Sequence, residues 1–502
     1  MASESRLLRE LGWVATLSLC GCDLVLGLGD YKEGAGGNTT ETTSTSPTSG
    51  STMTTGGACP ALALVGDADR TLTAGVEASI AVTVDGDADA IEWTQTDGPP
   101  IALPASGATS MSYTAPYVHD TFALRVTAKK AGCSDSSADV TLTPVASGTG
   151  VYVAPPPLGA DGAAGDAAHP LASLSIAMLN ANGRPIYVAE GEYVQDGYVA
   201  SSDLQLYGGY VPGPIWHRSH AKHVSKLRMP HDYASTTIEY VYGVDCRTTA
   251  CTIGGFTIEQ TAQSMTPTSK GGAVGVRLGP HDAQVFENTI IGPTLPQTEG
   301  HGSLGIIDTE SFSAGGVGNV VIHSNRILLG SGLGCLGVWL NRKVSMLDTW
   351  TIANNFIDVA SGLDDSGGIL LGDAGAIVAN TIVVSAKAAG TYSKNANQFA
   401  NVIRSDFPES AGMGCVSGGA GSIDHNSIFG FTLAVDQYCP MPTNPLPVDP
   451  TVTADGHLKT GSPAVDFAPF DNPIVDLLPP WDIDGEARRQ GAGLDLGCDE
   501  LK

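Results

Sequence analysis

Charged side chains follow a series of short apolar runs in the second half of the chain. Each run has the form of Gly275-Val276-Arg277-Leu278, and charged residues come a few positions later. If the runs stack as neighbouring strands about 4.8 Å apart, these side chains lie in one stripe. Carboxylates can act as general acid and base or hold Ca²⁺, and Arg or Lys can act as base, so the stripe could cleave a sugar bond. It consists of His281, Asp282, Glu310, Arg342, Lys343 and Asp373.

The same residues also fit the solvated edge of a row of turns, and the sequence favours this interpretation. The other outward positions carry no repeated set of acids and bases, and the HExxH, P-loop and GxSxG motifs are absent. We therefore expect a binding protein rather than an enzyme. If the chain is an enzyme, we expect a polysaccharide lyase or a glycoside hydrolase.

The apolar runs also present an outward face that could bind a sugar without cleaving it. Strand alternation points the residue after each Gly inward and the next residue outward. The inward set is Val276, Ile306, Val338, Ile369 and Cys415, and the outward set is Arg277, Ile307, Trp339, Leu370 and Val416. Because aromatic rings offer flat faces for stacking, Trp339 and Arg277 are the candidate carbohydrate contacts. Trp339 could equally be buried under a loop.

A second pattern, [VI]-x-x-N-x-I, recurs along the same region. Its asparagines are 21 to 37 residues apart, a spacing typical of a solenoid. A buried Asn at each bend would satisfy backbone groups, bond its equivalents in adjacent coils and tolerate the left-handed conformation of the bend. The asparagines are therefore expected to be structural. They are Asn288, Asn325, Asn355, Asn380 and Asn426, with a degenerate copy at Asn401.

The start of this region reads Tyr152-Val153-Ala154-Pro155, followed by Ile186-Tyr187-Val188-Ala189-Glu190-Gly191-Glu192-Tyr193. It resembles the first coil of right-handed parallel β-helix proteins of the pectin-lyase-like class. The resemblance implies a capping helix over roughly 171–182 and a β-helix over 150–444. Any enzyme of that class would work at the outer face or turns of adjacent coils.

The C-terminal residues 445–502 contain Ser462-Pro463-Ala464-Val465-Asp466, then Asp482-Ile483-Asp484-Gly485, then Asp495-Leu496-Gly497. They resemble the choice-of-anchor-type terminal segment of surface β-helix proteins. We expect this segment to cap the open edge of the last coil. Asp482 and Asp484 could bind Ca²⁺; the alternative is an ion pair between Asp484 and Arg488.

Residues 58–146 alternate apolar and polar residues in short runs broken by Gly, Asp and Pro, a pattern typical of a sandwich. Ile91-Glu92-Trp93-Thr94-Gln95, with Gly98-Pro99-Pro100 and the later Tyr113-Thr114-Ala115-Pro116, resembles the immunoglobulin-like repeats of the PKD/REJ type. The resemblance implies that Trp93 is a core residue. The predicted fold is all-β, a small immunoglobulin-like sandwich followed by a right-handed parallel β-helix.

Residues 1–22 have a weakly basic start, a short apolar stretch and then Leu19-Cys20-Gly21-Cys22. This end resembles the bacterial lipobox, which implies cleavage before Cys22 and lipid on that cysteine. The alternative is an ordinary secretory signal. Residues 23–57, rich in Thr, Ser and Gly, are expected to form a flexible linker. We expect the protein at the cell envelope, lipid-anchored on the outer membrane or cell surface.

Eight of the ten cysteines lie beyond the lipobox, an even number that suits disulfides in an oxidising compartment. Cys59 and Cys133 bracket the sandwich, whereas Cys246/Cys251 and Cys415/Cys439 are local pairs. Cys335 and Cys498 remain and could be free thiols. No CxxC pair occurs, which argues against a zinc site built from cysteines.

The net charge of −27 argues against nucleic acid as a partner and disfavours polyanionic glycans. The leading hypothesis is a membrane-tethered surface lipoprotein whose β-helix binds a polysaccharide or cell-surface glycan, or mediates adhesion. The alternatives are the lyase or hydrolase described above and a purely structural envelope protein. Apart from Ca²⁺, no cofactor is expected.

Overall fold

The computed structural model describes residues 59–501, except 99–100, 102, 116–119, 220–221, 234–239, 266–270, 296–300, 309–317, 342–347, 364–365, 386–387, 408–410, 417–420 and 490. The chain divides into two units, Met1–Ala58 and Cys59–Lys502, and all described residues belong to the second. Within these residues, no helix has the length and apolar character needed to cross a membrane.

The first part of the second unit is a sandwich of two sheets. One sheet has the order β1 (Ala61–Leu64), β3 (Glu77–Asp85), β5 (Ser110–Thr114); the other has β2 (Asp69–Thr73), β7 (Ser136–Val145), β6 (Phe122–Lys129), β4 (Ala90–Asp97). Alternate residues such as Ile80 and Leu124 are fully buried between the sheets. Trp93 lies in this core, as predicted, and its Nε1 donates to the Ala108 carbonyl oxygen (2.8 Å).

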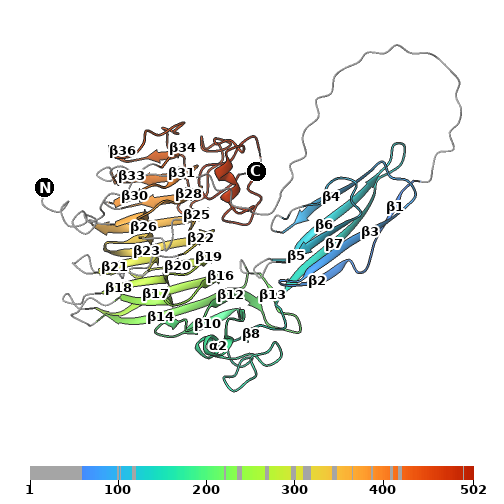
Figure 1. Ribbon diagram of the computed structural model, residues 1–502, viewed down its shortest axis with the longest axis horizontal. Helices are drawn as coiled ribbons and strands as arrows, with labels where there is room; N and C mark the ends of the chain where they lie inside the picture. The colour runs from blue at the N-terminus through green and yellow to red at the C-terminus, as the bar shows by residue number, and fades with distance from the viewer. Residues whose placement is uncertain are drawn as a thin grey trace, which may run out of the picture. The chain divides into compact units, whose positions relative to one another are not determined.

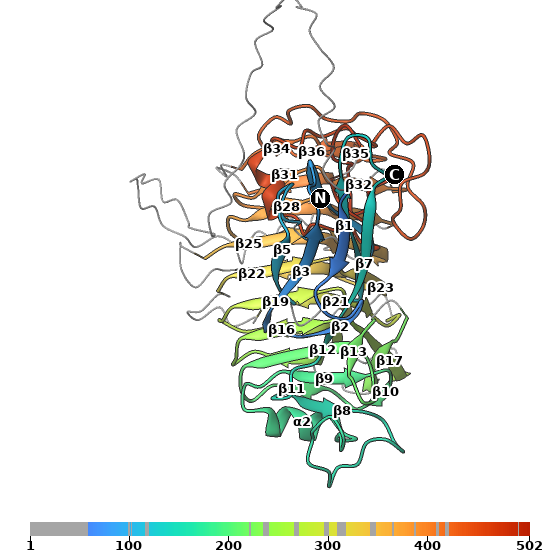
Figure 2. The same ribbon diagram turned by 90° about the vertical axis from the view of Figure 1, so that its right-hand side faces the viewer.

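The remainder is the predicted right-handed parallel β-helix, built from three stacks of strands (Figures 1 and 2). Sheet 1 contains β10 (Gly191–Val194), β14 (Ser225–Tyr233), β17 (Phe256–Met265), β20 (Thr289–Ile291), β23 (Arg326–Leu333), β26 (Phe356–Leu363), β29 (Thr381–Val384), β32 (Val402–Ser405) and β35 (Ser427–Phe429). Sheet 2 contains β11 (Tyr198–Val199), β15 (Tyr240–Cys246), β18 (Gly271–Leu278), β21 (His301–Ile307), β24 (Leu336–Leu340), β27 (Ser366–Leu371), β30 (Ala388–Ser393), β33 (Ala411–Cys415) and β36 (Leu433–Val435).

Sheet 3 contains β9 (Ile186–Ala189), β12 (Leu204–Val211), β16 (Cys251–Gly254), β19 (Ala283–Phe286), β22 (Val320–His323), β25 (Trp350–Ala353), β28 (Ala376–Val378), β31 (Asn397–Phe399) and β34 (Ile423–Asp424). The stack opens with β8 (Val151–Val153), which pairs with β9, and with helix α2 (Leu174–Ala181). The helix lies inside the predicted range 171–182 and ends at Asn182, which is left-handed.

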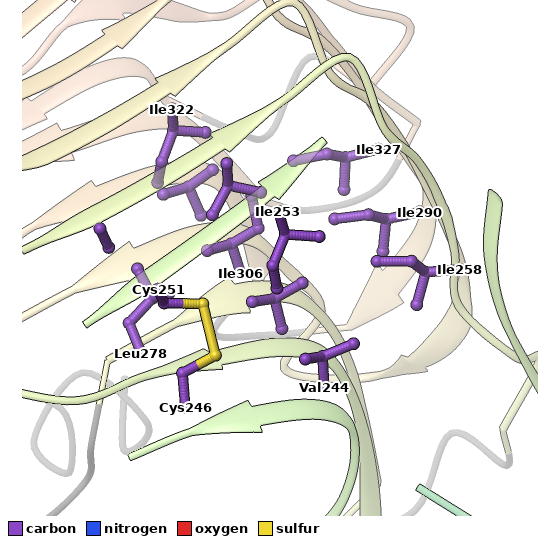
Figure 3. Close-up of a cluster of buried hydrophobic side chains, with 14 of the residues drawn as sticks. Val244, Cys246, Cys251, Ile253, Ile258, Leu278, Ile290, Ile306, Ile322 and Ile327 are labelled. Atoms are coloured by element: carbon purple, nitrogen blue, oxygen red, sulfur yellow. A yellow bond between two sulfur atoms is a disulfide. The ribbon is translucent and has the colours of Figure 1, made fainter. Parts of the chain in front are cut away.

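The interior of the coils is filled by aliphatic side chains in vertical columns. Ile253 and Ile322 of sheet 3 face Ile258 and Ile290 of sheet 1, and all four are at most 1% exposed (Figure 3). Ile and Val side chains stack in register from coil to coil, so the column buries apolar area continuously along the stack. Ile306 of sheet 2 completes the third wall of this core.

The repeated asparagines form the predicted ladder at the bend between sheets 3 and 1. Each side-chain Nδ2 donates to the Oδ1 of the next coil's Asn, at 2.8 to 3.1 Å, from Asn288 through Asn325, Asn355, Asn380 and Asn401 to Asn426. Every member is at most 1% exposed, and each also donates to backbone carbonyls. The ladder therefore provides side-chain partners for buried backbone carbonyls of the bend.

The expected left-handed conformation falls on the residue before each asparagine rather than on the asparagine itself. These residues have φ between 49° and 58°. The ladder asparagines themselves do not have positive φ, and their side chains reach the asparagine of the next coil. The left-handed residues are Glu287, Ser324, Asn354, Ala379, Ala400 and His425.

A column of glycines in sheet 2 allows a close approach between sheet 2 and sheet 1. A Cβ on Gly337 would overlap both Ile357 Cγ2 and the carbonyl oxygen of Gly368 in the next coil. Ile357 follows Asn355, the ladder residue of that next coil, so the glycine and asparagine patterns are coupled by packing between successive coils. The column is Gly243, Gly275, Gly305, Gly337, Gly368, Gly390 and Gly412.

The predicted inward and outward sets of sheet 2 hold for the coils of β18, β21, β24 and β27, leave out the coil of β30 and need correction at β33. Ile369 is in register with Thr391 of β30 and then with Met413, so Met413 and Gly414 hold the positions assigned to Cys415 and Val416. Two glycines two residues apart, Gly412 and Gly414, made the register ambiguous, and the column glycine is Gly412. Cys415 still points inward because alternation is preserved.

Only the start of the C-terminal segment, residues 445–502, pairs with the last coil, which the whole segment was expected to cap. After bridges from Thr443 and Leu446 to the last coil, it turns back and packs along the side of the stack (Figure 1). Its apolar residues, including Leu494 and Leu496, bury Val378 and Phe399 of sheet 3. The cause is apolar area: these outward residues would otherwise be exposed.

Three disulfides join the cysteines that the spacing grouped together. They are Cys59–Cys133 in the sandwich, Cys246–Cys251 between sheets 2 and 3 (Figure 3), and Cys415–Cys439 at the last coil. Cys335 and Cys498 are buried thiols. Burial raises the pKa of the Cys498 thiol to about 11, which makes it a poor nucleophile at neutral pH.

Candidate functional site

The outer face of sheet 2 is the region where ring-bearing and basic side chains come together. One outward column runs through Asp245, Arg277, Ile307, Trp339, Leu370 and Tyr392, each in register with the next. We call this column, with Tyr242 beside it, the sheet 2 face. Parallel strands about 4.8 Å apart hold its side chains at fixed intervals.

Arg277 is fixed by its neighbours on this face. Its guanidinium carbon lies 4.4 Å above the centre of the Tyr242 ring, and Nη1 lies 3.9 Å from Asp245 Oδ2. The Asp245 side chain is 2% exposed, forms an ion pair with Arg247 Nε (3.1 Å) and accepts from the Arg247 backbone N–H (3.1 Å). Stacking and the ion pair both restrict the guanidinium plane, so the Arg277 side chain is held in one orientation.

Trp339 is half-buried, between the two extremes that the sequence left open. It packs on an outward apolar cluster in which Val274 and Ile307 are fully buried and Leu304 is 3% exposed. Tyr392, two coils further on, is also half-buried, and burial is the main cause that raises the pKa of its hydroxyl. The sheet 2 face therefore presents partly exposed aromatic side chains, with a buried apolar cluster beneath Trp339.

The predicted charged stripe divides into residues that the structure describes and residues that it does not. Asp282 Oδ1 accepts from the backbone N–H of Asn319 (2.9 Å), and Asp373 Oδ1 accepts from the N–H of Ala374 (2.8 Å). Asp282 thus links its turn to the next coil and Asp373 closes its own turn, while His281 is exposed. Glu310, Arg342 and Lys343 lie outside the described residues, as does Cys22.

The aspartates of the C-terminal segment have separate roles. Asp482 is 1% exposed and accepts from three backbone N–H groups, those of Asp484, Glu486 and Glu500 (2.8 to 3.1 Å). Its burial raises the pKa of its carboxyl to about 6, against the lowering effect of these hydrogen bonds. Those backbone bonds occupy both oxygens, so the carboxylate organises a turn.

Asp484 pairs with Arg326 of β23 (2.9 Å) and His457 (3.0 Å) rather than with Arg488. Arg488 is buried and lies 3.5 Å from Glu500, and it donates to the Gly497 carbonyl oxygen (2.7 Å) and to the Asn354 side chain. The sequence pattern placed Asp484 and Arg488 four residues apart in a turn. The turn directs them to opposite sides, one toward solvent and one inward.

Sequence reasoning missed Tyr242, Asp245 and Tyr392 of the sheet 2 face. Extending the Gly-x-x pattern back to Gly243-Val244-Asp245 and forward to Gly390-Thr391-Tyr392 would have found Asp245 and Tyr392. Alternation alone would have pointed Tyr242 inward, because the strand departs from alternation at Gly243. Sequence reasoning also missed the group around His457, for which the sequence has no local signal.

Comparisons of the chain with protein-family models, with curated proteins and with solved structures found no match.

Proposed function

We propose that this protein is a membrane-tethered lipoprotein whose β-helix binds a polysaccharide or cell-surface glycan on the sheet 2 face. The observation that carries the proposal is the stack of Arg277 on Tyr242 in the same row of coils as Trp339. A guanidinium supplies several hydrogen-bond donors for hydroxyl groups, and an indole supplies an apolar surface for the flat side of a sugar ring.

The spacing favours a chain of sugars over a single one. Arg277 and Trp339 are two coils apart, about 10 Å along the stack. Tyr392 lies two coils beyond Trp339 in the same column. A ligand that contacts two of these positions must be elongated. The charge of Arg277 is already balanced by Asp245, and the chain as a whole carries −27, so the expected ligand is neutral.

The proposed anchor rests on the sequence Leu19-Cys20-Gly21-Cys22 and the polar linker after it. Lipid on Cys22 would hold the β-helix at a membrane surface. Cys22→Ser should move the protein from the membrane fraction to the soluble fraction, whereas Cys20→Ser should leave it in the membrane fraction. Intact-mass analysis should show acyl chains on the wild-type protein and none on Cys22→Ser; an unmodified wild-type mass would contradict the anchor.

Glycan binding is tested by affinity electrophoresis in gels that contain neutral polysaccharides. Trp339→Ala should weaken the retarding interaction about tenfold or more, since it removes a central aromatic contact. Arg277→Gln should weaken it less. Tyr438→Ala is the matched control, because Tyr438 is 51% exposed and lies outside the sheet 2 face.

Thermal unfolding of each variant separates lost binding from lost folding, and Trp339→Phe should restore part of the affinity. A wild-type protein that no polysaccharide in the panel retards would refute glycan binding. Equal weakening in Tyr438→Ala and Trp339→Ala would place the contact elsewhere.

A further inference from the structure

Three turns of the C-terminal segment converge on His457. Its Nδ1 lies 3.0 Å from Asp484 Oδ2 and 3.4 Å from Asp499 Oδ1, and the ligand-type atoms of the three residues all lie within 4.8 Å of one another. The residues come from 457, 484 and 499, positions far apart in a segment with almost no regular secondary structure. The convergence is therefore a product of tertiary folding.

The distances between the nitrogen and oxygen atoms of this group match those between neighbouring ligands of a metal ion. Zn²⁺ binds imidazole nitrogen and carboxylate oxygen at about 2.1 Å, and two ligands of a tetrahedral ion are then about 3.4 Å apart. The two nitrogen–oxygen separations at His457 are 3.0 and 3.4 Å. Two carboxylates supply the negative charge that a divalent cation needs, and beside them the charges of Arg326 and Asp455 offset each other.

The surroundings hold these three side chains in place. Asp455 Oδ2 and Arg326 Nη2 both lie 3.4 Å from the other ring nitrogen of His457, and a carboxylate in that position can orient a ligating imidazole. The second oxygen of Asp499 accepts from the Leu458 N–H (2.8 Å). Arg326 donates to Asp484 Oδ1 (2.9 Å), which leaves Oδ2 directed at His457.

The exposure of the group leaves one side open to solvent. The Asp499 side chain is 7% exposed, His457 26% and Asp484 42%. A metal ion held by the three would therefore have its remaining position toward water. Ca²⁺ fits less well, because it takes six to eight oxygen ligands, roughly, and disfavours nitrogen.

We propose that His457, Asp484 and Asp499 bind a divalent transition-metal ion, with Zn²⁺ the best match, and that the ion cross-links the C-terminal segment. Metal binding that requires the folded arrangement stabilises it. The ion would thus hold together a region that lacks the repeated strand contacts of the coils. This site is separate from the sheet 2 face and does not depend on glycan binding.

The test uses the untagged full-length protein in detergent, stripped of metal with a chelator. Thermal unfolding is followed with ZnCl₂, MnCl₂ or CaCl₂, and binding of ZnCl₂ is measured by calorimetry. Wild-type protein should bind one Zn²⁺ per chain that the variant His457→Gln does not bind, and Zn²⁺ should raise its unfolding temperature. Asp476→Asn, which alters a 75% exposed carboxylate of the same segment, should behave as wild type.

A spectroscopic measurement covers the case in which His457→Gln does not fold. Co²⁺ added to the stripped wild-type protein should give the strong visible bands of a tetrahedral site, and Zn²⁺ should displace them. Asp484→Asn should reduce the Zn²⁺ affinity at least tenfold. Absence of the His457-dependent Zn²⁺ site, or of the Co²⁺ bands, would overturn the proposal and leave the group as a hydrogen-bonded contact. A response to Ca²⁺ alone would overturn it as well.

Discussion

The coils of the β-helix and the C-terminal segment both bury polar side chains, but they hold them in opposite ways. In the coils one contact recurs, as in the step from Asn355 Nδ2 to Asn380 Oδ1 (2.9 Å). In the segment each contact occurs once, as between Arg488 and Glu500 (3.5 Å). Repetition spreads stability over many equal contacts, whereas the segment depends on a few pairs that cannot replace one another.

The largest expected effect comes from the middle of the ladder. Asn355→Ala removes a side chain that donates to the carbonyls of Ile322 and Ala353 and to Asn380, and it leaves all of them buried. Each unsatisfied buried group costs about 1–3 kcal/mol, so the free energy of unfolding should fall by about 5 kcal/mol. Chemical denaturation followed by circular dichroism measures it.

Asn426→Ala, at the last coil, is the control for position in the ladder. Asn426 accepts from Asn401 and donates only to backbone carbonyls, so its loss should cost less and open the end coil alone. Equal losses at Asn355 and Asn426 would show that the ladder does not act as a chain of linked contacts.

The next effect is expected in the C-terminal segment. Arg488→Met removes one partner of a buried ion pair in which both side chains are 1% exposed. Breaking such a pair costs about 3–5 kcal/mol, because the other charge stays buried. Hydrogen exchange should accelerate in the segment, and the ladder amides should remain protected.

The double variant Arg488→Met with Glu500→Gln should recover part of the lost stability, since it removes the orphaned charge. A single unfolding transition in which the coils lose protection together with the segment would contradict the separation of the two regions.

The smallest of the three effects concerns acid. His323, on the outward side of β22, stacks on Phe286, and burial lowers the pKa of its imidazole to about 4, despite the opposing charge of Glu287. Between pH 6.5 and pH 4 the unfolded chain binds a proton that the folded chain does not. Stability is therefore fully present above pH 6.5 and should fall by about 3 kcal/mol toward pH 4.

His323→Phe should flatten this part of the curve of unfolding free energy against pH. The exposed His281→Gln should leave it unchanged. A curve for His323→Phe that keeps the wild-type slope would mean that other groups of the coils cause the acid sensitivity.

The sequence was informative where structure repeats or where local spacing decides. The Asn pattern predicted the ladder, and Trp93 and the alternation around it predicted the core of the sandwich. Sequence reasoning gave the wrong register at Met413, where two nearby glycines fit the same pattern. It also did not predict where most of the C-terminal segment lies, because the segment packs on residues such as Val378 and Phe399 that look like ordinary strand residues.

By itself the sequence determined the class of fold, the coils and their buried columns, because each coil contacts a neighbour with the same pattern and the periodicity is written in the chain. Only the tertiary structure decided where the C-terminal segment lies and which residues meet around His457. Arg326 and Asp484 are 158 residues apart, and Arg488 and Asn354 are 134 apart. Contacts of that kind depend on which surfaces the finished coils leave to be covered, and no local pattern of residue types encodes them.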